Sequence, residues 1–330
     1  MNEKFAGILG LGSYVPDKIV TNKDLEKMVD TTDEWIVART GIHERRIVAQ
    51  DEATSDIATK AAQIALADAG ITASELDLII VATVTPDMAF PSSACLVQKN
   101  LGAMNAAAFD LTAVCSGFVY GLVVASQFIK SGTYRKILII GAETLSKITD
   151  WTDRNTSIVF GDGAGAVILG ETQPGCGILG MNLGADGTGG DLLKLPAGGS
   201  RQPASAQTVS DRLHYISMNG TEVFKFAVKI MGESAIKALE DAKLSPADIT
   251  YLVPHQANIR IIQSAAKRLG LPMDKVIVNV DKYGNTSAAS IPIALAEAVQ
   301  SGKIKNGDVL VLVGFGGGLT WAASVIKWCK

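Results

Sequence analysis

The stretch Asp68-Ala-Gly-Ile-Thr-Ala-Ser-Glu-Leu-Asp-Leu-Ile-Ile-Val81 returns later in the chain as Asp241-Ala-Lys-Leu-Ser-Pro-Ala-Asp-Ile-Thr-Tyr-Leu-Val253, shifted by 173 positions. The apolar run at residues 137–141 returns at residues 310–314 with the same shift. Related segments in the same order and at a nearly constant spacing indicate an internal duplication. We therefore expect a fold that is built from two similar halves.

Strand-like and helix-like patterns alternate outward from this repeat. Residues 78–83 and 136–141 are continuous apolar runs of the kind found in strands that are buried on both faces. Residues 55–70 and 117–130 have the apolar spacing of helices, and the second helix should end at Ser131-Gly132. This alternation predicts an α/β fold with mainly parallel or mixed sheets.

The stretch between the halves is rich in glycine, proline, serine and alanine, which is typical of a connection. We expect three parts: an N-terminal half at residues 1–183, a connecting excursion at 184–210 and a C-terminal half at 211–330.

The composition is that of an apolar and mildly acidic protein. Hydrophobic residues make up 48% of the 330 positions and charged residues 19%, and the net charge is −3. This balance predicts no general attraction to nucleic acid or to an anionic membrane. The most apolar helical stretch, 117–129, is too short to cross a bilayer, and the N-terminal residues lack the order of a secretion signal. We expect a cytoplasmic protein.

The cysteines follow neither the spacing of a metal site nor that of a disulfide framework. Cys95, Cys115, Cys176 and Cys329 are therefore expected to be free thiols in a reducing cytoplasm, with no metal bound. Cys115 differs in its context, Asp110-Leu-Thr-Ala-Val-Cys-Ser-Gly-Phe-Val119, where an extended run turns abruptly into a long apolar helix. Unpaired N–H groups and the dipole at the start of a helix favour a thiolate, so this bend predicts an acyl-transfer nucleophile.

Two downstream motifs supply possible partners for this thiol. His255 follows a predicted strand in Val253-Pro-His-Gln-Ala-Asn258, and Asn285 lies in a bend of small residues before another helix. A shift of 170 aligns Asn285 with Cys115, and a shift of 173 aligns His255 with Ala82, just past a strand. A buried histidine or an Asn cap would explain each residue separately. Together they lie where open α/β sheets build their sites.

Five motifs, including the two just described, complete the pattern. They are Thr31-Thr-Asp-Glu-Trp-Ile-Val-Ala-Arg39-Thr-Gly-Ile, Phe160-Gly-Asp-Gly-Ala-Gly, Val253-Pro-His-Gln-Ala-Asn, Gly284-Asn-Thr-Ser-Ala and Phe315-Gly-Gly-Gly. In this order, and with the Cys115 stretch, they resemble the initiating β-ketoacyl-acyl-carrier-protein synthases (synthase III) of bacterial fatty-acid synthesis, within the thiolase-like superfamily. The resemblance runs nearly end to end. It implies a thiolase-like fold with an α-β-α-β-α layered core, and a homodimer.

The resemblance also implies residue roles. Cys115 would accept a primer acyl group from acyl-CoA, His255 and Asn285 would hold the enolate formed from malonyl-acyl-carrier protein, and the N–H groups of Cys115 and Gly317 would form the oxyanion hole. The implied coenzyme A contacts are Thr31, Trp35, Arg39, Arg154, Gly220, Phe224 and Asn258. The implied carrier-protein contacts are Lys225, Gln256, Ala257, Asn258, Ile259, Arg260 and Lys267. Phe90 would limit the depth of the primer pocket, which favours a short acyl group such as acetyl.

These residue types suit a decarboxylative Claisen condensation. A cysteine thiolate accepts an acyl group as a thioester that is reactive enough to be passed on. A neutral histidine and an asparagine amide both donate to an enolate oxygen without removing a proton. A thiolase would need a second cysteine as base, and residues 314–321 contain none. The expected products are 3-oxoacyl-carrier protein, CO2 and coenzyme A, and no cofactor is needed.

Two alternatives remain open, and one motif is set aside. The chain could be a condensing enzyme of a secondary-metabolite pathway with the same mechanism, or a non-catalytic carrier-binding relative. The segment Gly161-Asp-Gly-Ala-Gly-Ala166 matches a dinucleotide-binding pattern, but the Val-Ile-Leu-Gly that follows predicts a strand. A phosphate-binding loop would be followed by a helix, so we expect no dinucleotide site there.

Overall fold

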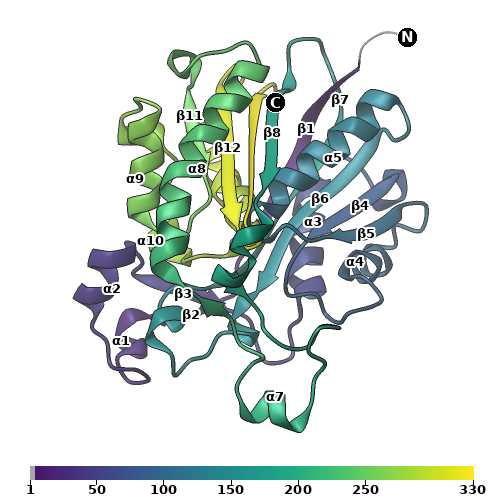
Figure 1. The fold of residues 1–330 in the computed structure, drawn as a ribbon. Coiled ribbons are helices and arrows are strands. Elements are labelled where there is room, and N and C mark those ends of the chain that lie inside the picture. The colour runs from purple at the N-terminus through teal and green to yellow at the C-terminus, as the bar shows by residue number, and fades with distance from the viewer. Residues whose placement is uncertain (1–3) are drawn as a thin grey trace.

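Two mixed β-sheets form the centre of the molecule, which is described by a computed structural model over residues 4–330 (Figure 1). The first sheet has the strand order β1-β7-β6-β4-β5, and the second has the order β11-β12-β13-β8. The strands of the first sheet are β1 (Phe5–Tyr14), β4 (Leu78–Ala82), β5 (Ala107–Leu111), β6 (Lys136–Thr144) and β7 (Asp162–Thr172). Those of the second are β8 (Gly177–Ala185), β11 (Tyr251–Pro254), β12 (Val309–Gly316) and β13 (Thr320–Lys327).

Short strands and helices complete the list of elements. Two small ribbons are made by β2 (Lys18–Thr21) with β3 (Glu44–Ile47) and by β9 (Leu193–Lys194) with β10 (Ser217–Met218). The helices are α1 (Asn22–Leu25), α2 (Asp33–Thr40), α3 (Thr54–Ala69), α4 (Ser93–Leu101), α5 (Gly117–Ser131), α6 (Arg154–Ser157), α7 (Ala206–Ser210), α8 (Gly220–Asp241), α9 (Ile259–Arg268), α10 (Val280–Tyr283) and α11 (Ser290–Gln300).

The predicted duplication is visible in the strand pairing. In the first sheet β1 is antiparallel to β7, β7 is antiparallel to β6, and β6 is parallel to β4. In the second sheet β8, β13, β12 and β11 pair in the same order and with the same directions. Only the first sheet continues with a further parallel strand, β5. The two halves therefore repeat one topology.

Five layers result, as the resemblance implied. Helices α5 and α11 pack between the two sheets, and their side chains share one core with inward-facing residues such as Ile80, Ile139, Val253 and Leu312. Helix α3 and helix α4 cover the outer face of the first sheet. Helices α8 and α9 cover the outer face of the second sheet (Figure 1). Burial on both faces explains why the central strands are continuous apolar runs.

Helix α5 corrects one sequence-based expectation. Together with the preceding turn, the apolar segment Val114–Ser131 has 18 residues, so by length and composition it could cross a membrane. The expected stretch of 117–129 was too short because it left out this turn and the last two residues of the helix, 130 and 131. The segment is 61% buried inside the protein, between the two sheets. Its apolar composition is accounted for by this central position.

The duplication also corrects the register at the two bends. The 3-10 turn Val114–Ser116 matches the 3-10 turn Ser287–Ala289 at a shift of 173. Cys115 therefore corresponds to Ala288, and Asn285, the predicted twin, lies three residues before this position. The shift of 170 holds only at the helix ends, where Gly132 and Gly302 both adopt left-handed backbone with φ of 76° and 71°. Helix α11 is shorter than helix α5, and this absorbs the difference.

The chain passes from the first sheet to the second at strand β8, before the predicted boundary between the N-terminal half and the connecting excursion. Strand β8 pairs with β13, so it belongs to the second sheet, and the boundary between residues 183 and 184 falls inside it. The connecting stretch then holds β9, α7 and loops, before β10 and the long helix α8.

The expectation of four free thiols is wrong. Cys176 and Cys329 form a disulfide across a sequence separation of 153, and Cys95 and Cys115 are free. The reason lies in the sheet: Lys327 at the end of β13 pairs with Gly177 at the start of β8, which brings the two cysteines together. No local spacing rule could reveal a pair that is set by strand register.

Candidate active site

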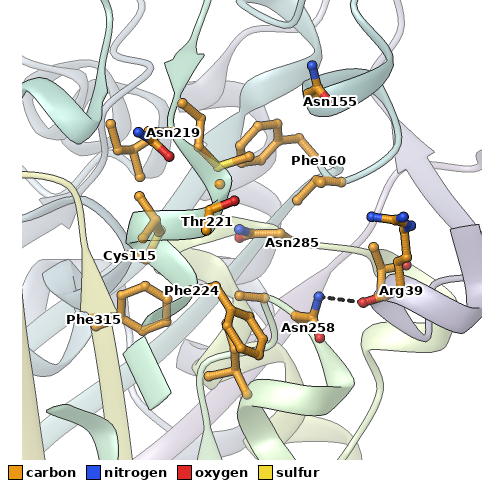
Figure 2. A pocket seen from close by; sticks show the side chains of 18 of the residues that line it. Arg39, Cys115, Asn155, Phe160, Asn219, Thr221, Phe224, Asn258, Asn285 and Phe315 are labelled. Carbon is orange, nitrogen blue, oxygen red and sulfur yellow. Dashed lines mark hydrogen bonds between the residues drawn. The ribbon is translucent and has the colours of Figure 1, made fainter. Parts of the chain in front are cut away.

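A cavity of about 1060 Å³ brings the predicted catalytic residues together (Figure 2). Cys115, His255, Asn285 and Phe315 line it, and all four side chains are buried. Exposed side chains also line it, so the cavity leads from solvent to the buried group; among these are Arg39, Asn219, Thr221, Lys225 and Arg260. A cavity that is lined by both exposed residues and a buried thiol suits an extended thioester substrate.

Cys115 occupies the predicted bend between β5 and α5. The residue before it, Val114, has a φ of 48°, which is rare for a β-branched side chain and costs about 1–3 kcal/mol. Such strain is typical of functional sites, because the surrounding structure must enforce it. The bend buries the thiol, which is 5% exposed, at the start of the helix that crosses the core.

Burial works against the resting thiolate that the sequence suggested. It raises the pKa of the Cys115 thiol to about 12, although the hydroxyl of Ser287 acts in the opposite direction. The negative charge of Glu143 raises this pKa further. In the empty site the thiol is therefore protonated, and its proton must leave as the acyl group arrives.

The glycine loop between β12 and β13 closes against the backbone of Cys115. A Cβ added at Gly316 would lie 2.6 Å from the backbone nitrogen of Cys115, so any side chain there would collide with it. A Cβ at Gly317 would meet the carbonyl oxygen of Leu193 at 2.8 Å instead. Gly316 lines the cavity, whereas Gly317 is not among the lining residues. The predicted role of the Gly317 N–H in an oxyanion hole stays a prediction.

His255 is buried in the cavity wall. Its backbone N–H donates to the carbonyl of Val313 in β12, and its ring packs edge-on against Phe315 with centroids 5.6 Å apart. Nδ1 lies 2.6 Å from Ser290 Oγ, whereas Nε2 is buried and has no partner among the residues described. Burial lowers the pKa of His255 to about 3, so the ring is neutral at physiological pH. An unpartnered polar atom on a cavity wall is suited to a ligand.

Asn285 is fixed at both its backbone and its side chain. Its N–H donates to Val159, and its carbonyl accepts from the N–H of Gly161 in the Phe160-Gly-Asp-Gly motif. Its Oδ1 accepts from the N–H of Ser287 at 2.8 Å. Because the amide oxygen is used in this bond, the Nδ2 group is the part of the side chain that remains for the cavity.

The sequence analysis missed Glu143, a fully buried carboxylate in this neighbourhood. It accepts hydrogen bonds from Thr85 Oγ1 at 2.6 Å, Ser287 Oγ at 2.9 Å, Val84 N at 3.1 Å and Thr83 Oγ1 at 3.2 Å. Burial raises its pKa to about 7, while these donors act in the opposite direction. In the sequence, Glu143 is marked only as a charged residue shortly after the apolar run 137–141. Its buried position could not be predicted, because its hydrogen-bond partners come from two distant segments.

Most of the expected coenzyme A contacts surround the outer part of the cavity. Trp35, Arg39, Gly220, Phe224 and Asn258 all line it, and Figure 2 shows the side chain of Asn258 donating to the backbone oxygen of Arg39, at 2.8 Å. The guanidinium groups of Arg39 and Arg154 lie 4.4 Å and 4.9 Å from the centre of the Trp35 ring. Arg154 and Thr31 are not among the lining residues. An aromatic ring with two cations beside it is suited to stacking against a nucleobase.

The expected carrier-protein contacts divide into surface and buried residues. Lys225, Arg260 and Lys267 are exposed cations, and Ile259 is half-buried at the start of α9. Ala257 is buried but lines the cavity.

Gln256 has no surface for a partner. Its side chain is 1% exposed, it donates to the carbonyls of Pro254 and Ile277, and it accepts from the N–H groups of Asn279 and Val280. Three of these four bonds tie the loop after β11 to residues 277–280 at the start of α10. The implied contact between Gln256 and a carrier protein is therefore wrong, because burial leaves this side chain a structural role.

Phe90 lies outside the cavity of its own chain. It is 85% exposed and does not line the cavity, so within one chain it cannot limit its depth. Met88 and Met104 are also exposed. Such large apolar side chains on the surface are typical of an interface with another molecule.

Residues 4–330 contain no group of three or more His, Cys, Asp or Glu side chains that could hold a metal ion.

Known proteins resemble this chain over its full length. Residues 109–187 match the family described as 3-oxoacyl-[acyl-carrier-protein] synthase III, and residues 239–328 match its C-terminal part. The β-ketoacyl-[acyl-carrier-protein] synthase III of Caldanaerobacter subterraneus subsp. tengcongensis is 63% identical over 331 residues, covering 100% of both chains. That of Clostridioides difficile is 59% identical over 328 residues and covers 99% of each chain.

Solved structures agree with this relationship. The crystal structure of 3-oxoacyl-[acyl-carrier-protein] synthase III from Aquifex aeolicus superposes with a TM-score of 0.91 at 48% identity, covering 98% of this chain and 100% of that one. The priming β-ketosynthase of the R1128 polyketide pathway superposes with a TM-score of 0.92 at 37% identity, covering 99% and 97%. By fold, cavity and sequence, this chain belongs to the β-ketoacyl-[acyl-carrier-protein] synthase III family.

Proposed function

We propose that this acyltransferase takes a short acyl group from acyl-CoA onto Cys115 and condenses it with malonyl-acyl-carrier protein. In the first step the thiol sulfur attacks the thioester carbonyl, the bond from carbonyl carbon to coenzyme A sulfur breaks, and the proton of Cys115 ends on the coenzyme A thiolate. The observation that carries this proposal is the meeting of Cys115, His255 and Asn285 on one cavity that reaches solvent.

In the second step the malonyl group loses CO2, and its C2 attacks the acyl carbon on Cys115. The bond between that carbon and the cysteine sulfur breaks, and the thiolate takes up a proton. Negative charge develops on the malonyl thioester oxygen before the new bond forms. His255 Nε2 and Asn285 Nδ2 are the groups left free to donate to that oxygen. Each such donor contributes about 3–4 kcal/mol to transition-state stabilisation.

The outer cavity would hold the coenzyme A and carrier arms in turn. Trp35 with Arg39 and Arg154 would stack on the adenine and neutralise phosphates, with Thr31, Gly220, Phe224 and Asn258 nearby. Lys225, Arg260 and Lys267 would attract an acidic carrier protein to the mouth of the cavity, where Ala257 and Ile259 add apolar contact. Positive side chains on a chain of net charge −3 favour such local recognition.

A homodimer would give Phe90 its expected role. The strand β5 lies at the edge of the first sheet, and its Phe109 is exposed, as are Met88, Phe90 and Met104. An uncovered sheet edge with large apolar side chains favours association with a second copy. Phe90 would then close the primer pocket of the partner subunit and favour acetyl over longer groups. The cytoplasm remains the proposed compartment, although disulfides are unusual there.

A role in a secondary-metabolite pathway is the second candidate. It has less support, because the polyketide priming enzyme is 37% identical to this chain, whereas the two β-ketoacyl-[acyl-carrier-protein] synthases III named above are 59–63% identical. A panel of straight and branched acyl-CoAs with malonyl-carrier protein decides between them. We expect 3-oxoacyl-carrier protein and CO2, with acetyl-CoA as the preferred primer. Preference for a long or unusual primer would favour the second candidate, and no condensation with any primer would refute the proposal.

A further inference from the structure

Ser290 is in direct contact with the imidazole of His255. It is the first residue of α11, it is 2% exposed, and its Oγ lies 2.6 Å from His255 Nδ1. The same Oγ accepts a hydrogen bond from the backbone N–H of Gln256 at 3.3 Å. One hydroxyl therefore links the ring to the loop that carries it.

The hydrogen-bonding capacity of these groups decides which ring nitrogen carries the proton. A neutral imidazole has one N–H, and a serine hydroxyl has one O–H with two lone pairs. If the Ser290 hydroxyl donates to Nδ1, its oxygen accepts the hydrogen bond from the Gln256 N–H, and the proton of the imidazole ring is on Nε2. In the reverse arrangement Nδ1 donates to Ser290, and the buried hydroxyl proton then needs a further acceptor. Residues 4–330 offer it none.

We propose that Ser290 is a positioning residue that fixes His255 in the Nε2–H form, so that the ring meets the substrate as a hydrogen-bond donor. The buried Nε2, which has no partner among the described residues, is then a donor whose acceptor arrives with the substrate. The opposite tautomer would place a lone pair against the thioester oxygen and repel it. An unsatisfied buried donor is costly in the empty site, and this cost is removed in the complex.

The catalytic consequence rests on the proposed function, but the tautomer does not. His255 is neutral because of burial alone, with no contribution from any charged side chain in residues 4–330. The backbone of Cys115 lies close to this residue: a Cβ at Gly314 would be 3.2 Å from the Cys115 carbonyl oxygen and 3.6 Å from the His255 Cβ. The tautomer can therefore be measured on the free enzyme at neutral pH.

The first test is nitrogen-15 NMR of the imidazole rings, which distinguishes a protonated ring nitrogen from a bare one. The chain has three histidines, and loss of one signal in His255→Ala identifies the relevant ring. We expect protonated Nε2 and bare Nδ1. Protonated Nδ1 with bare Nε2 in the wild-type enzyme would overturn the proposal, whatever the behaviour of any variant.

A matched pair of variants tests the catalytic consequence. Ser290→Asn can donate to Nδ1 and accept from Gln256, as serine does. The Asp side chain of Ser290→Asp has the same size as that of Asn, but its carboxylate can only accept hydrogen bonds. A neutral His255 ring in this variant therefore carries its proton on Nδ1, where it donates to the carboxylate. Nε2 is protonated only when the ring is cationic. We expect condensation by Ser290→Asp to fall with rising pH, to about 100-fold below Ser290→Asn at pH 8, as for loss of one transition-state donor.

Acylation of Cys115 from acyl-CoA serves as the internal control. A merely structural defect would slow acylation and condensation together and would show no difference in pH profile between the two variants. Equal condensation by the folded Asp and Asn variants at pH 8 would contradict the proposal. If neither variant folds, the wild-type tautomer alone decides. Absence of condensation in the wild-type enzyme would refute the proposed function, while the tautomer measurement would still stand.

Discussion

The backbone N–H of Ser287 donates to Asn285 Oδ1 at 2.8 Å, and the hydroxyl of the same serine donates to Glu143 Oε1 at 2.9 Å. Ser287 has a φ of 46°, a left-handed conformation that a non-glycine residue adopts only when its surroundings enforce it. The buried carboxylate thus helps to hold the peptide that orients the Asn285 amide. The Asn285 amide is therefore oriented by Ser287 and Glu143, neither of which is among the residues that line the cavity.

Replacing Asn285 by Asp should separate the two half-reactions. Asp keeps the size of the side chain and the acceptor for Ser287, but it has no N–H to donate. We expect condensation to fall by about 10²–10³-fold, while acylation of Cys115 changes by only a few-fold. Rapid-quench measurement of acyl-enzyme and 3-oxoacyl product would separate the two rates.

The matched control is Asn219→Asp, which adds the same charge on the cavity wall. Asn219 caps helix α8 through its side chain, a role that Asp fills equally well. At saturating substrate this variant should condense at close to the wild-type rate. Equal losses in both variants would mean that charge, and not the missing donor, slows the reaction.

Glu143→Gln should change how stability depends on pH. Burial raises the folded-state pKa of Glu143 to about 7, whereas the unfolded value is about 4.3, so between these values the folded state binds more protons. Ionisation of Glu143 therefore lowers the wild-type free energy of unfolding as pH rises through this window, by about 3–4 kcal/mol in total. The Gln variant has no ionisable group at this position, so its free energy of unfolding lacks this pH dependence.

Denaturant titrations of both proteins from pH 4 to 8 measure the effect. The difference between wild type and variant isolates Glu143, because the opposite influence of His255 is common to both: its pKa is lowered to about 3, so it costs stability as pH falls below about 6.5. We expect the free energy of unfolding of the wild type to fall relative to that of the variant as pH rises. A difference that is constant with pH would show that Glu143 is already ionised at low pH.

Gly316→Ala should block acylation. The new Cβ would lie 2.6 Å from the backbone nitrogen of Cys115, so either this loop or the Cys115 bend must move. We expect at least a 100-fold lower rate of acylation, because small displacements at a reacting centre have effects of about this size. Gly199→Ala is the control, since a Cβ there meets nothing within 4 Å. Normal acylation in Gly316→Ala would show that the loop yields without cost.

The disulfide should contribute to thermal stability. Cross-linking Cys176 to Cys329 closes a loop of about 150 residues, and loss of such a bond costs typically about 2–5 kcal/mol. Cys176→Ser and Cys329→Ser should lower Tm by the same amount, the double variant should show no further loss, and Cys95→Ser should have little effect. Thiol titration of the denatured, unreduced chain should find two thiols; four would contradict the pairing.

The fold was largely predictable from the sequence because duplication leaves a repeated signal. The shift of 173 found in residues 68–81 is the shift that relates β4 to β11 and β6 to β12. Buried strands and capped helices have local signatures as well. The strand-to-helix bends were placed less well, because α11, with 11 residues, is shorter than α5, with 15, and the alignment offset changes from 173 to 170 inside the helix.

What the sequence did not reveal depends on contacts between distant segments. The partners of Glu143 lie about 60 and 144 residues away, and those of Cys176 lie 153 residues away. Gln256 was assigned to a partner surface, although three of its four hydrogen bonds join the loop around it to residues 277–280. Motifs identify which residues share a site, but only the packed structure shows which of them reach the cavity.

The most direct test of the account is the mass of the peptide that contains Cys115. The enzyme is incubated with acetyl-CoA, digested, and compared with a sample that then receives malonyl-carrier protein. We predict one acetyl group on Cys115 and none on Cys95, and its complete loss in the second sample with formation of 3-oxobutanoyl-carrier protein. An unmodified Cys115 peptide while the condensation product accumulates would contradict the central claim.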